Sequence, residues 1–149
     1  MRFVVVLCIT FLTFQCFGTQ IHVGPKEKIK SLRSALMHAA NGDTVYVKHS
    51  QYKEGTIVIN KSITLQGLDW PVLDGQLKYE VVSIKADDVR FSGFIVKNSG
   101  YASLTDPGGV KVYDRRNVTV ENNIFENNFF AVYIQYGKNC IIKIQMSSI

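Results

Sequence analysis

The sequence predicts an all-β fold, a right-handed parallel β-helix in which each coil of the chain lies on the coil before it. The first observation is a repeat, because residues 117–120 return as residues 139–142 and residues 110–112 return as residues 132–134. The second is the alternation of apolar and polar residues within these short runs, which is typical of strands with one buried face. The third is the Asn and Gly between runs, which suit sharp bends. Short strands repeating at this spacing predict a solenoid whose coils share one core.

The same register extends toward the N-terminus. Residues 63–67 match residues 89–93, and these match residues 118–122. In this alignment Asn98 falls on Asn127. Asparagines at equivalent bends favour left-handed backbone conformations and side-chain ladders along a stack. We therefore expect an asparagine ladder at one corner of the solenoid.

The first residues predict a secretory signal peptide over residues 1–18. Arg2 precedes an apolar run over residues 3–12, and Gly18 is a small residue at a plausible cleavage point. The run is too short to span a membrane, so we expect a periplasmic or secreted protein with no membrane span after signal removal. Residues 19–149 then predict one parallel β-helix domain.

Residues 25–41 predict an amphipathic α-helix ahead of the first full coil. Apolar residues recur along it at helical spacing, at Ile29, Leu32, Leu36 and Ala39. Gly42 is placed to end this helix in a left-handed conformation. Such a helix would cap the open end of the stack, where apolar surface and strand edges otherwise meet water.

The other end of the sequence shows no matching cap. Residues 141–149 run out within a coil and offer no second helix. Because an uncovered solenoid end favours aggregation, we expect either a domain truncated at its C-terminal end or a partner that pairs with the last coil.

Several runs resemble the N-terminal coils of the NosD family, periplasmic β-helix proteins of the carbohydrate-binding and sugar-hydrolase type that mature nitrous oxide reductase. The runs are residues 56–67, 70–75, 89–94, 117–123 and 130–134. The resemblance covers most of the chain after the signal peptide, but only the first part of the longer family members. It implies a non-catalytic accessory role in copper-centre assembly, with an ABC transporter and nitrous oxide reductase as protein partners and copper as a possible ligand.

A copper site would need soft or imidazole ligands. The candidates are His22, His38, His49 and Met37, which form no recognisable spacing motif. Isolated surface histidines are the alternative interpretation. Cys140 falls where Val118 stands one coil earlier, so we expect it to be a small inward hydrophobe.

An enzyme that cleaves acidic polysaccharides is a second interpretation, because other parallel β-helices have that activity. It would need clustered carboxylates, often with an arginine nearby. The candidates are Asp114, Arg115 and Arg116 at one bend, with Asp87 and Asp88 at the equivalent bend one coil earlier. Solvated charges at a bend are the alternative.

A carbohydrate-binding or surface interaction module is a third interpretation. Tyrosines that could line a sugar-binding face are Tyr101, Tyr113, Tyr133 and Tyr136. Tyr133 alternates with apolar neighbours, so we expect it to face outward. The net charge of +5 is spread along the chain, whereas nucleic-acid binding favours a concentrated basic stripe.

Overall fold

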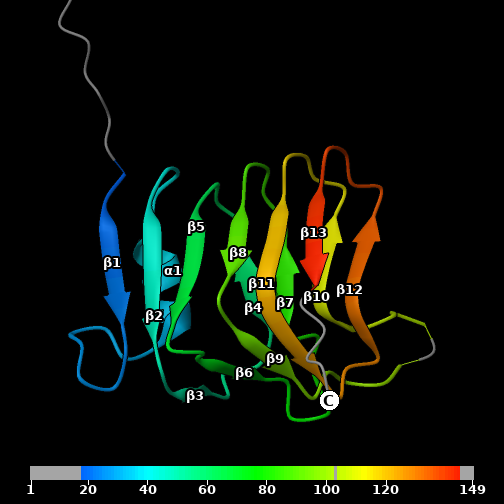
Figure 1. Cartoon of the computed structure of the whole chain (residues 1–149), viewed down its shortest axis with the longest axis horizontal. Coiled ribbons are helices and arrows are strands. Elements are labelled where there is room, and N and C mark those ends of the chain that lie inside the picture. The colour runs from blue at the N-terminus through cyan, green and yellow to red at the C-terminus, as the bar shows by residue number, and fades with distance from the viewer. Residues whose placement is uncertain (1–17, 103, 145–149) are drawn as a thin grey trace, which may run out of the picture.

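The computed structural model describes residues 18–102 and 104–144 and is a parallel β-solenoid of about five coils (Figure 1). The predicted fold class is thus confirmed. Three faces run along the stack. Face A contains β1 (Gln20–Val23), β2 (Thr44–Lys48), β5 (Thr64–Leu68), β8 (Arg90–Ser92), β11 (Thr119–Glu126) and β13 (Ile141–Ile144). Face B contains β3 (Gln51–Tyr52), β6 (Val72–Asp74), β9 (Ile95–Lys97) and the end of β11. Face C contains β4 (Ile57–Ile59), β7 (Val82–Ile84), β10 (Gly108–Tyr113) and β12 (Phe130–Gln135).

The strand register agrees with the repeats in the sequence. On face A, Arg90 pairs with Thr64 on one side and with Thr119 on the other, and Thr119 pairs with Ile141. On face C, Val110 pairs with Val132. β11 bends from face A into face B, so these two faces form one continuous sheet, whereas face C is a separate one.

Inward side chains of successive coils stack on one another and form the core. Val45, Leu65, Phe91 and Val120 lie in one register row and are all buried. The rings of Phe91 and Phe94 stack with centroids 4.6 Å apart. Burying each such side chain contributes about 1.5–3 kcal/mol, so the row is a continuous source of stability along the axis.

The predicted asparagine ladder is present at the bend after face B. Asn98 and Asn127 both have left-handed backbones, with φ of 57° and 49°. Asn127 Nδ2 donates to Asn98 Oδ1 (2.9 Å), and Asn98 Nδ2 donates to Asp74 Oδ1 (3.0 Å). Burial alone would raise the pKa of Asp74, but hydrogen bonds from Asn98, the Gln76 backbone and Gln51 lower it below its ordinary value.

The helix is shorter than the predicted range of residues 25–41, because α1 spans Leu32–His38. The residues before it form a loop, in which the Gly24 N–H donates to the Ile29 carbonyl (3.0 Å). Ser31 starts the helix by accepting a hydrogen bond from the Ser34 N–H (3.2 Å). The prediction was too long at this end because Ile29 continues the apolar stripe while its backbone bridges to Val23.

The helix also ends earlier than predicted. Its C-cap is Ala39, whose backbone is extended, and Gly42, with φ of +90°, lies in the turn that leads into β2. Asp43 explains the early end, because its carboxylate accepts hydrogen bonds from the Ala40 N–H (2.8 Å) and the Thr19 N–H (2.7 Å). These bonds fix the chain in a turn where the helix would otherwise continue.

Two charged residues from the following coil hold the ends of α1. The Glu54 carboxylate accepts three hydrogen bonds at the N-terminus, from Ser31 Oγ (2.8 Å), Leu32 N–H (2.9 Å) and Arg33 N–H (2.9 Å). The Lys61 ammonium donates at the C-terminus to the carbonyls of Leu36 (3.0 Å), Met37 (2.9 Å) and Ala39. Both charges oppose the helix dipole. α1 packs against β1, β2 and β4 and caps the first coil as predicted.

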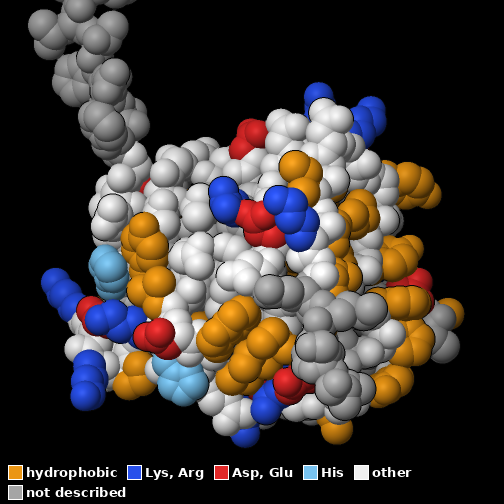
Figure 2. All heavy atoms as spheres, in the orientation of Figure 1, with side chains coloured by type: hydrophobic (Ala, Val, Ile, Leu, Met, Phe, Trp, Pro, Cys, Tyr) orange, Lys and Arg blue, Asp and Glu red, His pale blue; other side chains and the backbone are white. Residues whose placement is uncertain are grey.

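Charged side chains also form a ladder on face A. Arg90 and Lys143 each form a salt bridge with Glu121, at 2.5 and 3.1 Å, and Figure 2 shows such a group of charges over the middle of this face. In residues 18–102 and 104–144, no helix has the length and apolar character that a membrane crossing requires. The predicted signal peptide lies almost entirely outside the described residues, as does the end of the chain after Ile144.

Candidate functional site

Face C carries a group of aromatic and cationic side chains on its outer surface. Ser83, Lys111 and Tyr133 lie in one register row across β7, β10 and β12. Lys111 is only 6% exposed, and its ammonium lies 5.0 Å from the ring centroids of both Tyr113 and Tyr133. The ammonium also donates to the Thr105 carbonyl (2.8 Å). Lys111 therefore holds the loop between β9 and β10 against this face.

Tyr113 links this row to the half-buried carboxylate of Glu80. Its hydroxyl lies 2.9 and 3.0 Å from the two Glu80 carboxylate oxygens, and the Ser83 hydroxyl donates to the same group. Burial and the hydrogen bond to Glu80 raise the pKa of Tyr113 to about 12. The Lys85 ammonium also lies close to Tyr113, 4.9 Å from its ring centroid. Tyr113 is thus protonated at neutral pH and donates to Glu80.

A cleft of about 310 Å³ opens beneath the loop. Its walls include Lys78, Glu80, Tyr101, Thr105 and Tyr113. Beside the cleft the aromatic rings continue in a chain. The centroid distances are 5.4 Å for Tyr101–Phe129, 4.7 Å for Phe129–Phe130 and 5.7 Å for Phe130–Tyr133. Tyr101, Phe129 and Phe130 are exposed, so this edge of face C offers ring surfaces to a ligand.

The charges of face C are not balanced by ion pairs within the part of the chain that the structure describes. The salt bridges there join Lys48 to Glu27 and Arg90 and Lys143 to Glu121, away from face C. Lys85 and Lys111 on this face, and Lys78 at the wall of the cleft, therefore have no salt-bridge partner among the described residues. Exposed ammonium groups without a carboxylate partner, such as those of Lys78 and Lys85, favour the approach of an anion.

The structure does not bring the predicted copper ligands together. Each histidine contacts a different element: His22 stacks on Tyr46 (5.2 Å), His38 Nδ1 lies 2.8 Å from the Ser34 carbonyl, and His49 Nδ1 lies 2.7 Å from the Asp69 carbonyl. Over the described ranges, no group of three or more His, Cys, Asp or Glu side chains could hold a metal ion.

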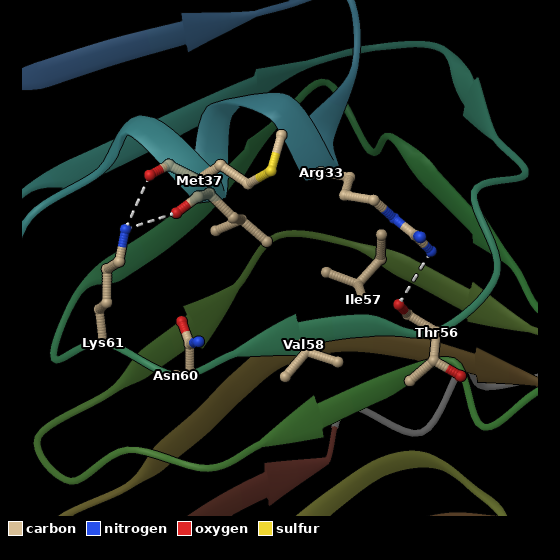
Figure 3. A pocket seen from close by; sticks show the side chains of 8 residues that line it. Arg33, Met37, Thr56, Ile57, Val58, Asn60 and Lys61 are labelled. Atoms are coloured by element: carbon tan, nitrogen blue, oxygen red, sulfur yellow. Dashed lines mark hydrogen bonds between the residues drawn. The ribbon is translucent and has the colours of Figure 1, made fainter.

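Met37 lines a different hollow, between α1 and β4 (Figure 3). This hollow measures about 430 Å³, with apolar walls that include Leu36 and Val58. Arg33 and Lys61 also line it, but Arg33 Nη2 donates to the Thr56 carbonyl (3.4 Å) and Lys61 donates to the helix carbonyls. The two cations are thus engaged in contacts within the protein. The hollow is the junction between α1 and β4, the edge strand of face C, where the helix takes the place of a further strand.

The predicted catalytic candidates do meet at one corner. The Arg116 N–H donates to Asp87 Oδ1 (2.9 Å), so the two bends are neighbours as expected. Asp88 accepts a hydrogen bond from the Asn117 side chain (2.9 Å). Asp114 is exposed at the same bend. The two carboxylates at residues 87 and 88 are thus engaged in corner hydrogen bonds.

Of the remaining predicted residues, Cys140 and Tyr133 lie in the expected orientations. Arg115 is half-buried at this corner, and its Nε has no hydrogen-bond partner. Cys140 packs against the core, as its alignment with Val118 predicted. Tyr133 faces outward on face C, and Tyr136 is 80% exposed at the next bend.

The sequence interpretation missed Glu80, Lys85 and Lys111, which complete the face C site. One signal was present, because Lys111 alternates with Val110 and Val112 and is in register with Tyr133. No comparable signal exists for Glu80, which lies in an irregular segment.

Comparison with family models, curated proteins and solved structures finds no match to this chain.

Proposed function

We propose that this protein is a non-catalytic binding module whose face C binds a glycan that carries carboxylates. The observation that carries the proposal is the alternation of lysines and tyrosine rings, Lys85–Tyr113–Lys111–Tyr133, on one regular strand face. Aromatic rings offer flat amphipathic surfaces against which sugar rings pack, and the lysines supply positive charge for uronic acid carboxylates. The cleft beneath the loop gives the chain of sugars a concave place to bind.

Two features favour binding over cleavage. Glycoside hydrolysis uses a pair of carboxyl groups, and the cleft offers Glu80, whose oxygens already accept hydrogen bonds from Tyr113 and Ser83. A tyrosine that acts as a general base needs a lowered pKa, whereas the pKa of Tyr113 is raised to about 12.

Isothermal titration of the full chain with polygalacturonate tests the proposal. We expect binding that weakens as salt is added, because exposed charges are screened. Lys85→Ala removes an exposed charge and Tyr133→Ala removes a ring face, contacts with a ligand that are each worth ~0.5–1 kcal/mol. Each variant should therefore weaken binding roughly two- to fivefold.

Lys26→Ala is the matched control, because Lys26 is an exposed lysine in the loop after β1. It should leave the affinity unchanged. Failure of the wild-type chain to bind polygalacturonate, or equal binding by the Lys85→Ala/Tyr133→Ala double variant, would exclude face C as the glycan site.

A role in copper-centre assembly with an ABC transporter and nitrous oxide reductase is a second proposal. Its support is the resemblance of the sequence runs to the NosD family together with the β-solenoid fold. Copper(I) titration of the chain against a competing chelator, without oxygen, tests direct copper handling. Stoichiometric binding lost on substitution of His22, His38 and His49 would favour this role, and absence of binding would count against it.

A further inference from the structure

The bend between β5 and β6 is longer than the bends that follow it along the stack. The strand register shows which segments are equivalent in successive coils. Residues 66–72 occupy the position that the shorter segments 92–95 and 121–124 occupy in the two following coils. The additional residues, which include Asp69 and Trp70, must project outward from the corner between faces A and B. Figure 2 looks onto this side and shows hydrophobic side chains gathered near β6 and β9.

The projecting bend and the shorter bends beside it enclose a notch of about 380 Å³. Its lining is Gly67, Leu68, Asp69, Trp70, Gly93 and Asn122. The two glycines leave its floor without side chains. A Cβ on Gly67 would lie 2.2 Å from the Gly93 carbonyl oxygen, so the coils approach there as only glycine permits. The coils that carry the two glycines therefore pack backbone against backbone at the notch.

Trp70 is held beside this floor by an uncommon backbone. Asp69 and Trp70 both have left-handed conformations, with φ of 59° and 57°. For a bulky residue this conformation is an outlier, and such outliers concentrate at functional sites. His49 supports the bend, because its Nδ1 lies 2.7 Å from the Asp69 carbonyl. The bend thereby leaves the indole 37% exposed at the rim of the notch.

We propose that this notch is a second binding site and that its ligand is a neutral hexose. The indole offers an apolar face for the C–H side of a pyranose ring. The exposed side chains of Asp69 and Asn122 supply carboxylate and amide groups for the sugar hydroxyls, which is the mixture typical of small-ligand sites. Among the described residues no salt bridge includes Asp69, so its negative charge disfavours the acidic sugars that face C attracts.

The sequence provides a direct reporter, because Trp70 is its one tryptophan. The full chain is titrated with gluco-, manno- and galactohexaose while tryptophan emission is recorded. We expect a saturable change in emission with at least one of these neutral probes. Polygalacturonate, the proposed ligand of face C, should not change the emission. The fluorescence titration therefore tests the notch, and the calorimetric titration with polygalacturonate tests face C, so either proposal can fail without the other.

Asp69→Gly and Asn122→Gly test the polar contacts and retain the reporter. Glycine adopts the left-handed backbone at both positions without strain, so each variant removes a side chain and little else. Each should weaken binding by about tenfold, whereas the control Asp88→Gly, at a left-handed bend elsewhere, should bind like the wild type. Trp70→Ala lacks the reporter, so its binding is measured by calorimetry once circular dichroism has shown that it folds. This variant should lose binding. No saturable change with any hexaose, or wild-type affinity in Asp69→Gly, would overturn the proposal.

Discussion

Tyr113 couples the geometry of face C to pH. Its hydroxyl donates to Glu80, and its ring centroid lies 4.9 and 5.0 Å from the ammonium groups of Lys85 and Lys111. The pKa of Tyr113 rises from its ordinary value of 10.0 to about 12 because burial and Glu80 both disfavour the phenolate. A raised folded-state pKa stabilises the protein below the unfolded pKa, and this contribution is lost as pH rises from about 10 to about 12.

Tyr113→Phe should therefore lower the free energy of unfolding by ~1.5–3 kcal/mol at neutral pH, the range for a hydrogen bond to a charged group. The difference in the free energy of unfolding between the variant and the wild type should decrease between pH 10 and about 12, because the Tyr113 hydroxyl of the wild type loses its proton in this range. Urea unfolding at stepped pH measures this. The exposed Tyr136→Phe is the control and should match the wild type throughout. If the difference in the free energy of unfolding between Tyr113→Phe and the wild type did not change with pH, the raised pKa of Tyr113 would be contradicted.

At the level of single residues, the sequence predicted those features that depend on neighbours in the repeat. The Asn98–Asn127 ladder and the outward Tyr133 both follow from coil alignment, and both are confirmed. Glu80 and the left-handed Trp70 were not predicted, because they lie in bends whose lengths differ between coils. Their positions depend on loop geometry that no repeat specifies.

At the level of elements, α1 has its ends fixed by side chains from the next coil. The apolar stripe predicted that a helix exists, but Glu54, Lys61 and Asp43 decide where it begins and ends. These contacts join positions far apart in the sequence. The periodicity of apolar residues therefore predicts where the helix lies but not where it ends.

Lys61→Met should destabilise the protein by ~1–2 kcal/mol, because it removes the charge at the helix C-terminus and its hydrogen bonds while retaining the apolar stem. Urea unfolding monitored by circular dichroism measures the change. Lys53→Met, at an exposed lysine near the same coil, should be neutral. Equal stability of the two variants would show that Lys61 does not support the helix.

At the level of the whole molecule, stability should vary along the axis. β5 and β8 each have a strand neighbour on both sides, whereas β13 pairs with β11 alone among the described strands. Ile141 and Ile144 on β13 are 50% and 49% exposed. In a solenoid each coil contacts only its neighbours, so the least covered coil opens at the lowest free energy.

We therefore expect native-state hydrogen exchange to be at least about tenfold faster in β13 than in β5 and β8, a difference of ~1.4 kcal/mol in opening free energy. Mass spectrometry of peptic fragments resolves these segments. Uniform protection across them would mean that the described coils open as one unit.

The stacking order also bears on how the chain acquires its structure during synthesis. From β5 onward, each described strand pairs with a strand of the preceding coil, as β5 does with β2 and β8 with β5. Strand pairing among the described residues therefore needs no segment from the far end of the chain. Ribosomes deliver chains from the N-terminus, and N-terminal units generally fold first. With α1 and β1 closing the starting end, the protein can assemble vectorially, each finished coil serving as the template for the next.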